Sequence, residues 1–212
     1  MDLVPYIAKQ GDHLSLLAQR FGCSPDDIWN EPRNAELKRI RKNPNILSPG
    51  DLVYVPKLEP KWLTLKAGTT NTFTAKAHQI TVALRFVENG KPLAHAKYEI
   101  DGVAVPPGAT DDKGGVRLSV PVTTVQFTLR FVERHETHLI RVGHLDPANE
   151  ASGAWSRLAC LGYLGGRARG SGTGSAAELS AALRVFQRSE RLDVSGDLDE
   201  ATVSKLEELF GS

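Results

Sequence analysis

The N-terminal architecture follows from YIAKQGDHLSLLAQRFG (residues 6–22). Residues 6–8 predict a short strand. Asp12 predicts the N-cap of the next helix, because its carboxylate can accept a hydrogen bond from a free backbone N–H of the first turn. Apolar residues recur at positions 14, 17, 18 and 21, which is the spacing of one helical face. Gly22 predicts the helix end, since glycine readily adopts the left-handed conformation found there.

A second helix and a closing strand complete this segment. In SPDD (residues 24–27), Ser24 predicts an N-cap, Pro25 suits the first helical position, and Asp27 can bond back from the third. DLVYVP (residues 51–56) predicts a strand that ends at its proline, which has no N–H to donate. The predicted order is therefore strand, helix, helix, strand.

Together with NILSPGDLVYVP (residues 45–56), the opening stretch resembles a LysM domain. The resemblance implies two helices on a two-stranded antiparallel sheet, and binding of the N-acetylglucosamine-containing glycan of peptidoglycan or chitin. It also implies a shallow glycan groove between two loops. That predicted groove consists of Gly11, Asp12, His13, Leu14, Asn45, Ile46, Leu47, Ser48 and Pro49.

The connection over residues 30–42 is longer and more charged than is usual in that family, and it is called the insert below. Its basic residues are Lys38, Arg39, Arg41 and Lys42. One interpretation is a solvated helix face. The other is a contact surface for a protein partner. Because the insert abuts residues 45–49, it can extend, reshape or block the predicted groove.

The middle of the chain has β character. Residues 79–87 alternate between apolar and polar side chains, Asn89-Gly90 is a tight-turn signal, and further alternating runs extend to residue 142. Short strands with regularly spaced turns predict an antiparallel β-sandwich. Its order of strands and turns is similar to immunoglobulin-like or transthyretin-like modules, which implies a spacer.

The strongest candidate for a catalytic motif is HETH (residues 135–138), which is one residue shorter than the His-Glu-x-x-His zinc motif. The flanking residues favour a strand, on which the two histidines point to opposite faces. No nucleophile elbow, phosphate loop or dinucleotide fingerprint is present in the sequence. The sequence therefore predicts no metal, no cofactor, no catalytic residue and no enzymatic activity.

The C-terminal segment predicts three helices. The first spans residues 154–161, SAAE (residues 175–178) is a capping box that opens the second, and Asp199 caps the third. The strings RLACLGY (157–163), ALRVFQ (182–187) and SGDLDEAT (195–202) resemble the small three-helix peptidoglycan-binding domain of cell-wall hydrolases. This resemblance implies a second wall-binding surface, for which the candidates are Tyr163, Arg167, Arg169 and Phe186. The alternative for Tyr163 and Phe186 is a place in the core.

Composition sets further limits. The 212 residues are 41% hydrophobic with a formal net charge of +1, which excludes wholesale disorder and argues against a nucleic-acid binder. No apolar run reaches the roughly 18 residues of a membrane span, and no secretory signal is visible. Cys23 and Cys160 predict reduced, buried thiols rather than a disulfide. The predicted fold class is multidomain α+β, with a LysM-like domain over 1–60, the sandwich over 61–150 and the three-helix domain over 151–212.

The predicted function is a non-catalytic peptidoglycan-binding accessory protein that is made in the cytoplasm without a signal peptide. IWNEPRNAELKR (residues 28–39), combined with a terminal wall-binding module, resembles accessory proteins of type VI secretion and phage-tail-like contractile injection systems. That resemblance implies export by such a machine to the periplasm or a target cell. One alternative is a docking or adaptor module on a secretion spike or baseplate protein. The other is a cell-wall hydrolase with an unrecognised site.

Overall fold

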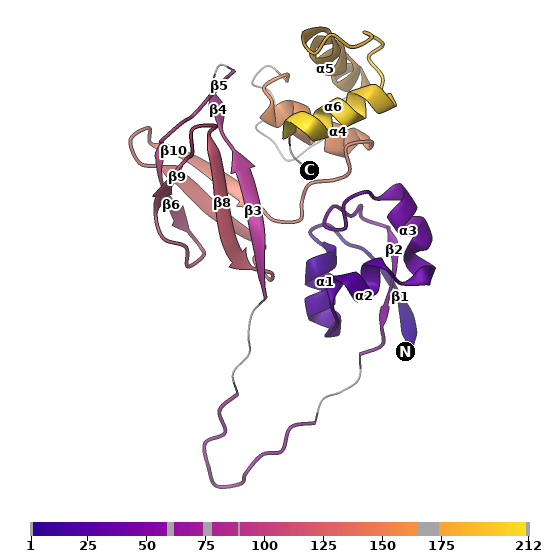
Figure 1. Cartoon of the computed structure of the whole chain (residues 1–212), viewed down its shortest axis with the longest axis vertical. Coiled ribbons are helices and arrows are strands. Elements are labelled where there is room, and N and C mark those ends of the chain that lie inside the picture. Colours follow the sequence, from indigo (N-terminus) through magenta and orange to yellow (C-terminus); the bar gives the residue numbers. More distant parts are fainter. Residues whose placement is uncertain (1, 59–61, 74–77, 89, 165–173, 211–212) are drawn as a thin grey trace.

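The computed structural model describes residues 2–58, 62–73, 78–88, 90–164 and 174–210. It combines helices with small antiparallel sheets, and its buried apolar side chains form three clusters along the chain. Each cluster is the core of one part (Figure 1). These parts are called the N-terminal module (residues 2–56), the β module (79–142) and the helical module (151–210).

The N-terminal module contains the two predicted strands and two predicted helices, but its first strand covers residues 3–7 rather than 6–8, and a further helix lies in the insert. Strand β1 (Leu3–Ile7) pairs antiparallel with β2 (Leu52–Pro56). Helices α1 (Leu14–Phe21) and α2 (Pro25–Trp29) follow β1, and the insert folds into a 3-10 turn η1 (Pro32–Asn34) and α3 (Ala35–Ile40). The core contains Leu14, Leu17, Ala18, Ile28, Val53 and Val55.

Helix α1 begins one residue later than predicted. Its N-cap is His13, whose Nδ1 accepts a hydrogen bond from the backbone N–H of Leu16 at 3.3 Å. Asp12 is instead buried, and its Oδ2 accepts from the Tyr6 hydroxyl at 2.7 Å and the Lys9 backbone N–H at 2.9 Å. The prediction of Asp12 as the cap is wrong because its carboxylate closes the preceding turn.

The other local signals of this module are confirmed. Ser24 and Asp27 form a reciprocal capping box, and Gly22 ends α1 with a φ of 67°. The side chain of Asn34 forms hydrogen bonds that the sequence did not predict. Its amide donates to the carbonyls of Ile28 at 2.9 Å and Tyr54 at 2.8 Å, and accepts from the Tyr54 N–H at 2.7 Å. These hydrogen bonds hold the insert against β2.

The β module contains three small antiparallel sheets. One pairs β3 (Gln79–Arg85) with β8 (Gly115–Pro121), and a short hairpin pairs β4 (Val87–Glu88) with β5 (Lys91–Pro92). The largest has the order β10 (Glu136–Arg141), β9 (Gln126–Phe131), β6 (Lys97–Asp101), β7 (Gly108–Ala109). Leu118 of β8 and Phe127 and Leu129 of β9 belong to one core, so two sheets share their apolar faces.

The first strand of the β module starts at Gln79, where the sequence predicts the first alternating run. The predicted domain boundary at residue 61 lies well before this strand, and the described residues between Pro56 and Gln79 contain no helix or strand. Residues 62–73 of this stretch lie away from the modules (Figure 1). They expose large apolar side chains, and Trp62 is 92% exposed.

The helical module contains α4 (Ala151–Cys160), α5 (Ala176–Ser189) and α6 (Glu200–Phe210) around one core. Ser175 and Glu178 form the predicted capping box. Asp199 Oδ1 accepts from the Thr202 N–H at 2.8 Å, which confirms it as the cap of α6. Both cysteines are free, but Cys23 is half-buried and Cys160 exposed, so the prediction of buried thiols is wrong. Within the described ranges, no helix has the length and apolar character needed to cross a membrane.

Candidate functional site

The predicted glycan groove is covered by a segment from the far side of the sequence. Residues 143–150, called the covering segment, connect the β module to α4 and run against the N-terminal module (Figure 1). The approach at Gly143 is close, because a Cβ there would lie 2.4 Å from the Gly11 carbonyl oxygen and 3.2 Å from His13 Cδ2. Ser48 Oγ donates to Glu150 Oε2 at 2.6 Å, so both groove loops contact the covering segment.

More than half of the predicted groove residues are buried, and two of them, Leu14 and Leu47, belong to the core of the N-terminal module. Those that are buried are Asp12, His13, Leu14, Leu47 and Ser48, while Gly11 and Ile46 are half-buried. Asn45 and Pro49 remain exposed. In this conformation the predicted groove is closed, and the covering segment closes it rather than the insert.

Arg41 joins three parts of the chain. Its guanidinium donates from Nε and Nη2 to the two carboxylate oxygens of Asp51, both at 2.8 Å, and Nη2 also lies 2.8 Å from Glu150 Oε1. The hydrogen bond with Asp51 raises the pKa of Arg41. Its side chain is only 10% exposed. Arg41 therefore links the insert to Asp51, the residue before β2, and to the covering segment. The prediction of Arg41 as a surface contact for another protein is wrong.

The other basic residues of the insert differ from one another. Lys38 donates to Asn30 Oδ1 at 2.8 Å and lies over the Trp29 ring, while Arg39 pairs with Glu36 on an exposed face. Lys42 is exposed and, among the described residues, has no acidic oxygen within 4.0 Å. The interpretation of the insert as a solvent-exposed helix face therefore fits Arg39. Lys42 instead lines a cavity.

One residue of the predicted second wall-binding surface is buried. Phe186 is fully buried in the helical core, so the prediction that its ring faces a ligand is wrong. Tyr163 is half-buried against it with ring centroids 5.2 Å apart, and the Tyr163 hydroxyl lies 2.7 Å from Ser189 Oγ. Arg167 and Arg169 lie outside the described residues.

The HETH string lies where the sequence placed it, at a strand. His138 is in β10, and its ring packs against Phe86 and Phe131. His135 precedes the strand with a φ of 53°. Glu136 forms an ion pair with Arg134. In the part of the chain that the structure describes, no three His, Cys, Asp or Glu side chains are grouped to hold a metal ion.

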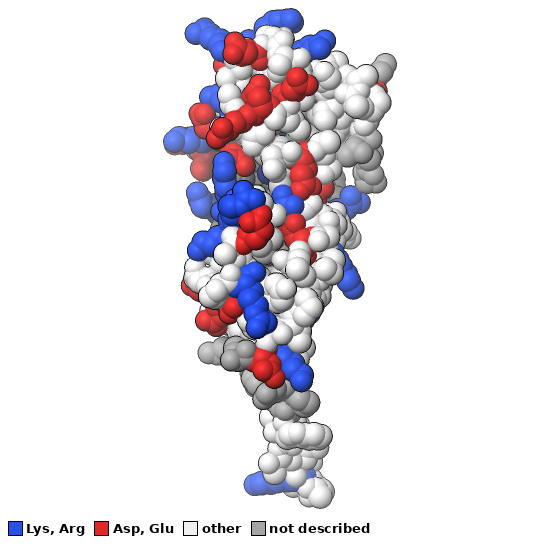
Figure 2. Space-filling model, turned by 90° about the vertical axis from the view of Figure 1, so that its right-hand side faces the viewer, with Lys and Arg blue, Asp and Glu red and all other residues white. Residues whose placement is uncertain are grey.

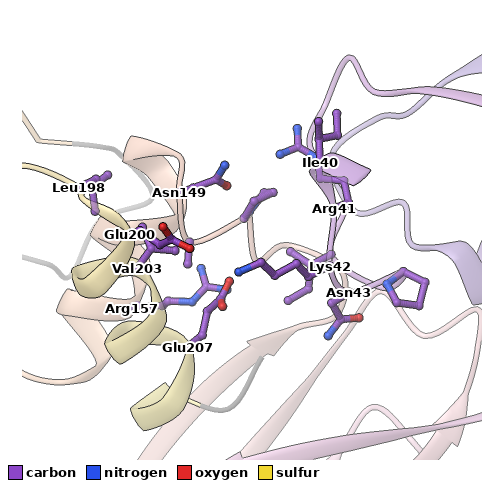
Figure 3. A pocket seen from close by; sticks show the side chains of 14 residues that line it. Ile40, Arg41, Lys42, Asn43, Asn149, Arg157, Leu198, Glu200, Val203 and Glu207 are labelled. Carbon is purple, nitrogen blue, oxygen red and sulfur yellow. The ribbon is translucent and has the colours of Figure 1, made fainter. Parts of the chain in front are cut away.

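A cavity of about 650 Å³ lies between the N-terminal and helical modules. Figure 3 shows the insert on one side and helices α4 and α6 on the other. Its lining includes five charged residues, which are Arg41, Lys42, Arg157, Glu200 and Glu207. Arg157 belongs to the RLACLGY string, but nothing in that string predicted that its side chain would be 1% exposed.

On the face in Figure 2, basic and acidic side chains are interspersed. That face has no single-sign basic patch of the kind that binds a nucleic-acid backbone.

Residues 137–206 match the family model of a putative peptidoglycan binding domain. No curated protein and no solved structure matches the chain. A peptidoglycan-binding domain is therefore present, over about one third of the sequence. The match begins in β10, includes the whole covering segment, and ends in α6.

His13 should make the N-terminal module sensitive to mild acid. Burial lowers its pKa below the usual value, against opposing effects of Asn45 and Asp12. The stability contributed by neutral His13 is complete above its unfolded pKa of about 6.5 and is lost as the pH falls toward the folded pKa.

The variant His13→Asn keeps an N-cap acceptor but does not titrate. We expect its melting temperature to fall less than that of the wild type between about pH 7.5 and about pH 5.5. Differential scanning fluorimetry measures both, and equal decreases would refute this role of His13.

Proposed function

We propose that this chain is a non-catalytic protein that binds peptidoglycan through its helical module. The observation that carries the proposal is the family match over residues 137–206, which covers α4, α5 and most of α6. The structure supports it by giving these helices a common core that includes Leu158, Leu183 and Leu206. We infer that they form the predicted three-helix bundle, and that the two sheets sharing a core form the predicted sandwich.

The non-catalytic part of the proposal rests on the placement of the reactive residues. The half-buried His138 ring packs against Phe86 and Phe131, and Glu136 is paired with Arg134. The proposed export by a contractile secretion machine rests only on the resemblance of residues 28–39. Peptidoglycan lies outside the cytosol, so the proposed function requires some route across the envelope.

A docking role has one observation in its favour. The stretch between the N-terminal and β modules exposes Trp62, Leu63 and Leu65, each by more than half. Large apolar side chains gathered on one exposed stretch are typical of a protein contact. Docking on a spike or baseplate protein is thus the second candidate, and it is compatible with wall binding by the helical module.

Co-sedimentation with purified, protein-free sacculi tests the proposed function. We expect the full-length chain at about 10 µM to pellet with sacculi, because modest glycopeptide affinities of about −4 to −8 kcal/mol suffice at that concentration when sites are abundant. Soluble muropeptides should not be released during the incubation. A folded chain that stays in the supernatant would contradict wall binding, and muropeptide release would contradict the non-catalytic assignment.

A further inference from the structure

The cavity between the two modules is lined by four side chains, of both charge signs, that form no close ion pairs with one another. Lys42 comes from the insert, Arg157 from α4, and Glu200 and Glu207 from α6. Among the described residues, none of these four forms an ion pair within 4.0 Å. Charged side chains that line a cavity without a close ion-pair partner indicate a site for a ligand that carries charge.

Arg157 is the strongest sign of such a ligand. Its side chain is buried, with 1% of the residue exposed, and its Nη1 donates to two neutral carbonyls, Asp146 at 2.7 Å and Gly153 at 3.0 Å. Its Nε has no hydrogen-bond partner, and its guanidinium lies 5.6 Å from the Phe210 ring centroid. Burial lowers the pKa of Arg157, and the nearby carboxylates of Glu207 and Asp146 offset this effect only in part. An anionic group bound in the cavity would supply further compensation.

The arrangement of the charges defines the chemistry of the ligand. Figure 3 shows Lys42 pointing across the cavity toward Arg157 and Glu207. The two cations suit a carboxylate, and the carboxylates of α6 suit an ammonium group. Besides Asn43 and Asn149, the remaining lining is apolar and consists of Ile40, Pro44, Ile46, Pro147, Ala148, Leu198 and Val203. Small aliphatic side chains fit such walls, and about 650 Å³ is the size of a site for a short peptide.

We propose that this cavity binds a short peptide bearing both a terminal carboxylate and a free ammonium group, and specifically the peptide stem of peptidoglycan. Arg157 and Lys42 hold the carboxylate, while Glu200 and Glu207 hold the ammonium. The identification of the peptide rests on the proposed function. The site itself is composite, because Lys42 lies outside the matched residues 137–206. The N-terminal module thus contributes a wall of the peptide site while its own predicted groove is covered.

Isothermal titration calorimetry of the full-length chain with a synthetic stem pentapeptide tests this proposal. We expect binding that weakens about tenfold in Lys42→Ala and in Glu207→Gln, each of which removes one charge-assisted contact. Both side chains lie at the surface of the cavity, so these variants should fold. Lys113→Ala, at an exposed turn of the β module, is the matched control and should bind like the wild type. Acetylation of the peptide's free amine should weaken binding to the wild type.

The outcomes separate this proposal from the proposed function. Binding to intact sacculi with no binding of the pentapeptide at about millimolar concentration would overturn the peptide site and leave wall binding standing. Equal affinities of Lys42→Ala, Glu207→Gln and Lys113→Ala would also overturn it. Failure to bind both sacculi and peptide would overturn both proposals. Loss of peptide affinity in the two cavity variants, with retained affinity in the control, supports the site.

Discussion

An Arg41→Ala chain should show a free energy of unfolding of the N-terminal module about 3 kcal/mol smaller than the wild type. The substitution removes two hydrogen bonds to Asp51 and the ion pair with Glu150. Asp51 has a side chain only 7% exposed, so it would be left as a buried carboxylate without its cation. Removing one partner of a buried ion pair typically costs about 3–5 kcal/mol. We take the lower end because the Glu150 side chain is 32% exposed.

Native-state hydrogen exchange measures this effect where it should occur. Amides of β1 and β2 should exchange faster in Arg41→Ala than in the wild type. Amides of the covering segment should also exchange faster, because Glu150 loses its cation. Arg39→Ala is the matched control, since the Arg39–Glu36 pair is exposed on both sides and such pairs contribute little. If the two variants exchange alike at β1 and β2, the proposed role of Arg41 is wrong.

A Gln187→Ala chain should lose about 3 kcal/mol of stability in the helical module. Gln187 is fully buried in α5 and holds the turn before α6. Its Nε2 lies within hydrogen-bond distance of Ser195 Oγ at 3.1 Å, the Asp197 carbonyl at 3.0 Å and Thr202 Oγ1 at 3.0 Å. Its Oε1 accepts from the Gly196 N–H at 2.8 Å. Each lost bond costs about 1 kcal/mol, and the Gly196 N–H is left buried without an acceptor.

Urea denaturation followed by circular dichroism at 222 nm measures this loss, because helices dominate that signal. Arg188→Ala on the exposed face of the same helix is the control and should stay within about 0.5 kcal/mol of the wild type. A Gln187→Ala midpoint equal to that of Arg188→Ala would show that this network does not hold the turn.

Features that depend on neighbours in sequence were predictable. The capping boxes at Ser24 and Ser175 each involve residues three positions apart, so the sequence string contains both partners. The alternation over residues 116–120 likewise indicated which side chains face the core. The exception was the cap of α1, where Asp12 and His13 are adjacent and tertiary contacts decided between them.

Features that depend on distant segments were not predictable. Ser48 and Glu150 form a hydrogen bond although about a hundred positions separate them, and no local pattern indicates that the covering segment closes the predicted groove. Lys42 and Arg157 were both noticed in the sequence, the first as part of a basic run and the second as part of a motif. Only the structure places them at one cavity. Glu207, which also lines this cavity, lies in no string that the sequence singled out, so the sequence did not predict the cavity.

The central claim is that the helical module holds the chain to peptidoglycan, and a binding isotherm on sacculi tests it most directly. The wild type and Gln187→Ala are titrated with sacculi at a temperature at which the helical module of the variant has unfolded and that of the wild type has not, and free protein is measured in the supernatant. We expect saturable depletion of the wild type and at least tenfold weaker depletion of the variant. Equal depletion of both, or none of the folded wild type, would contradict it.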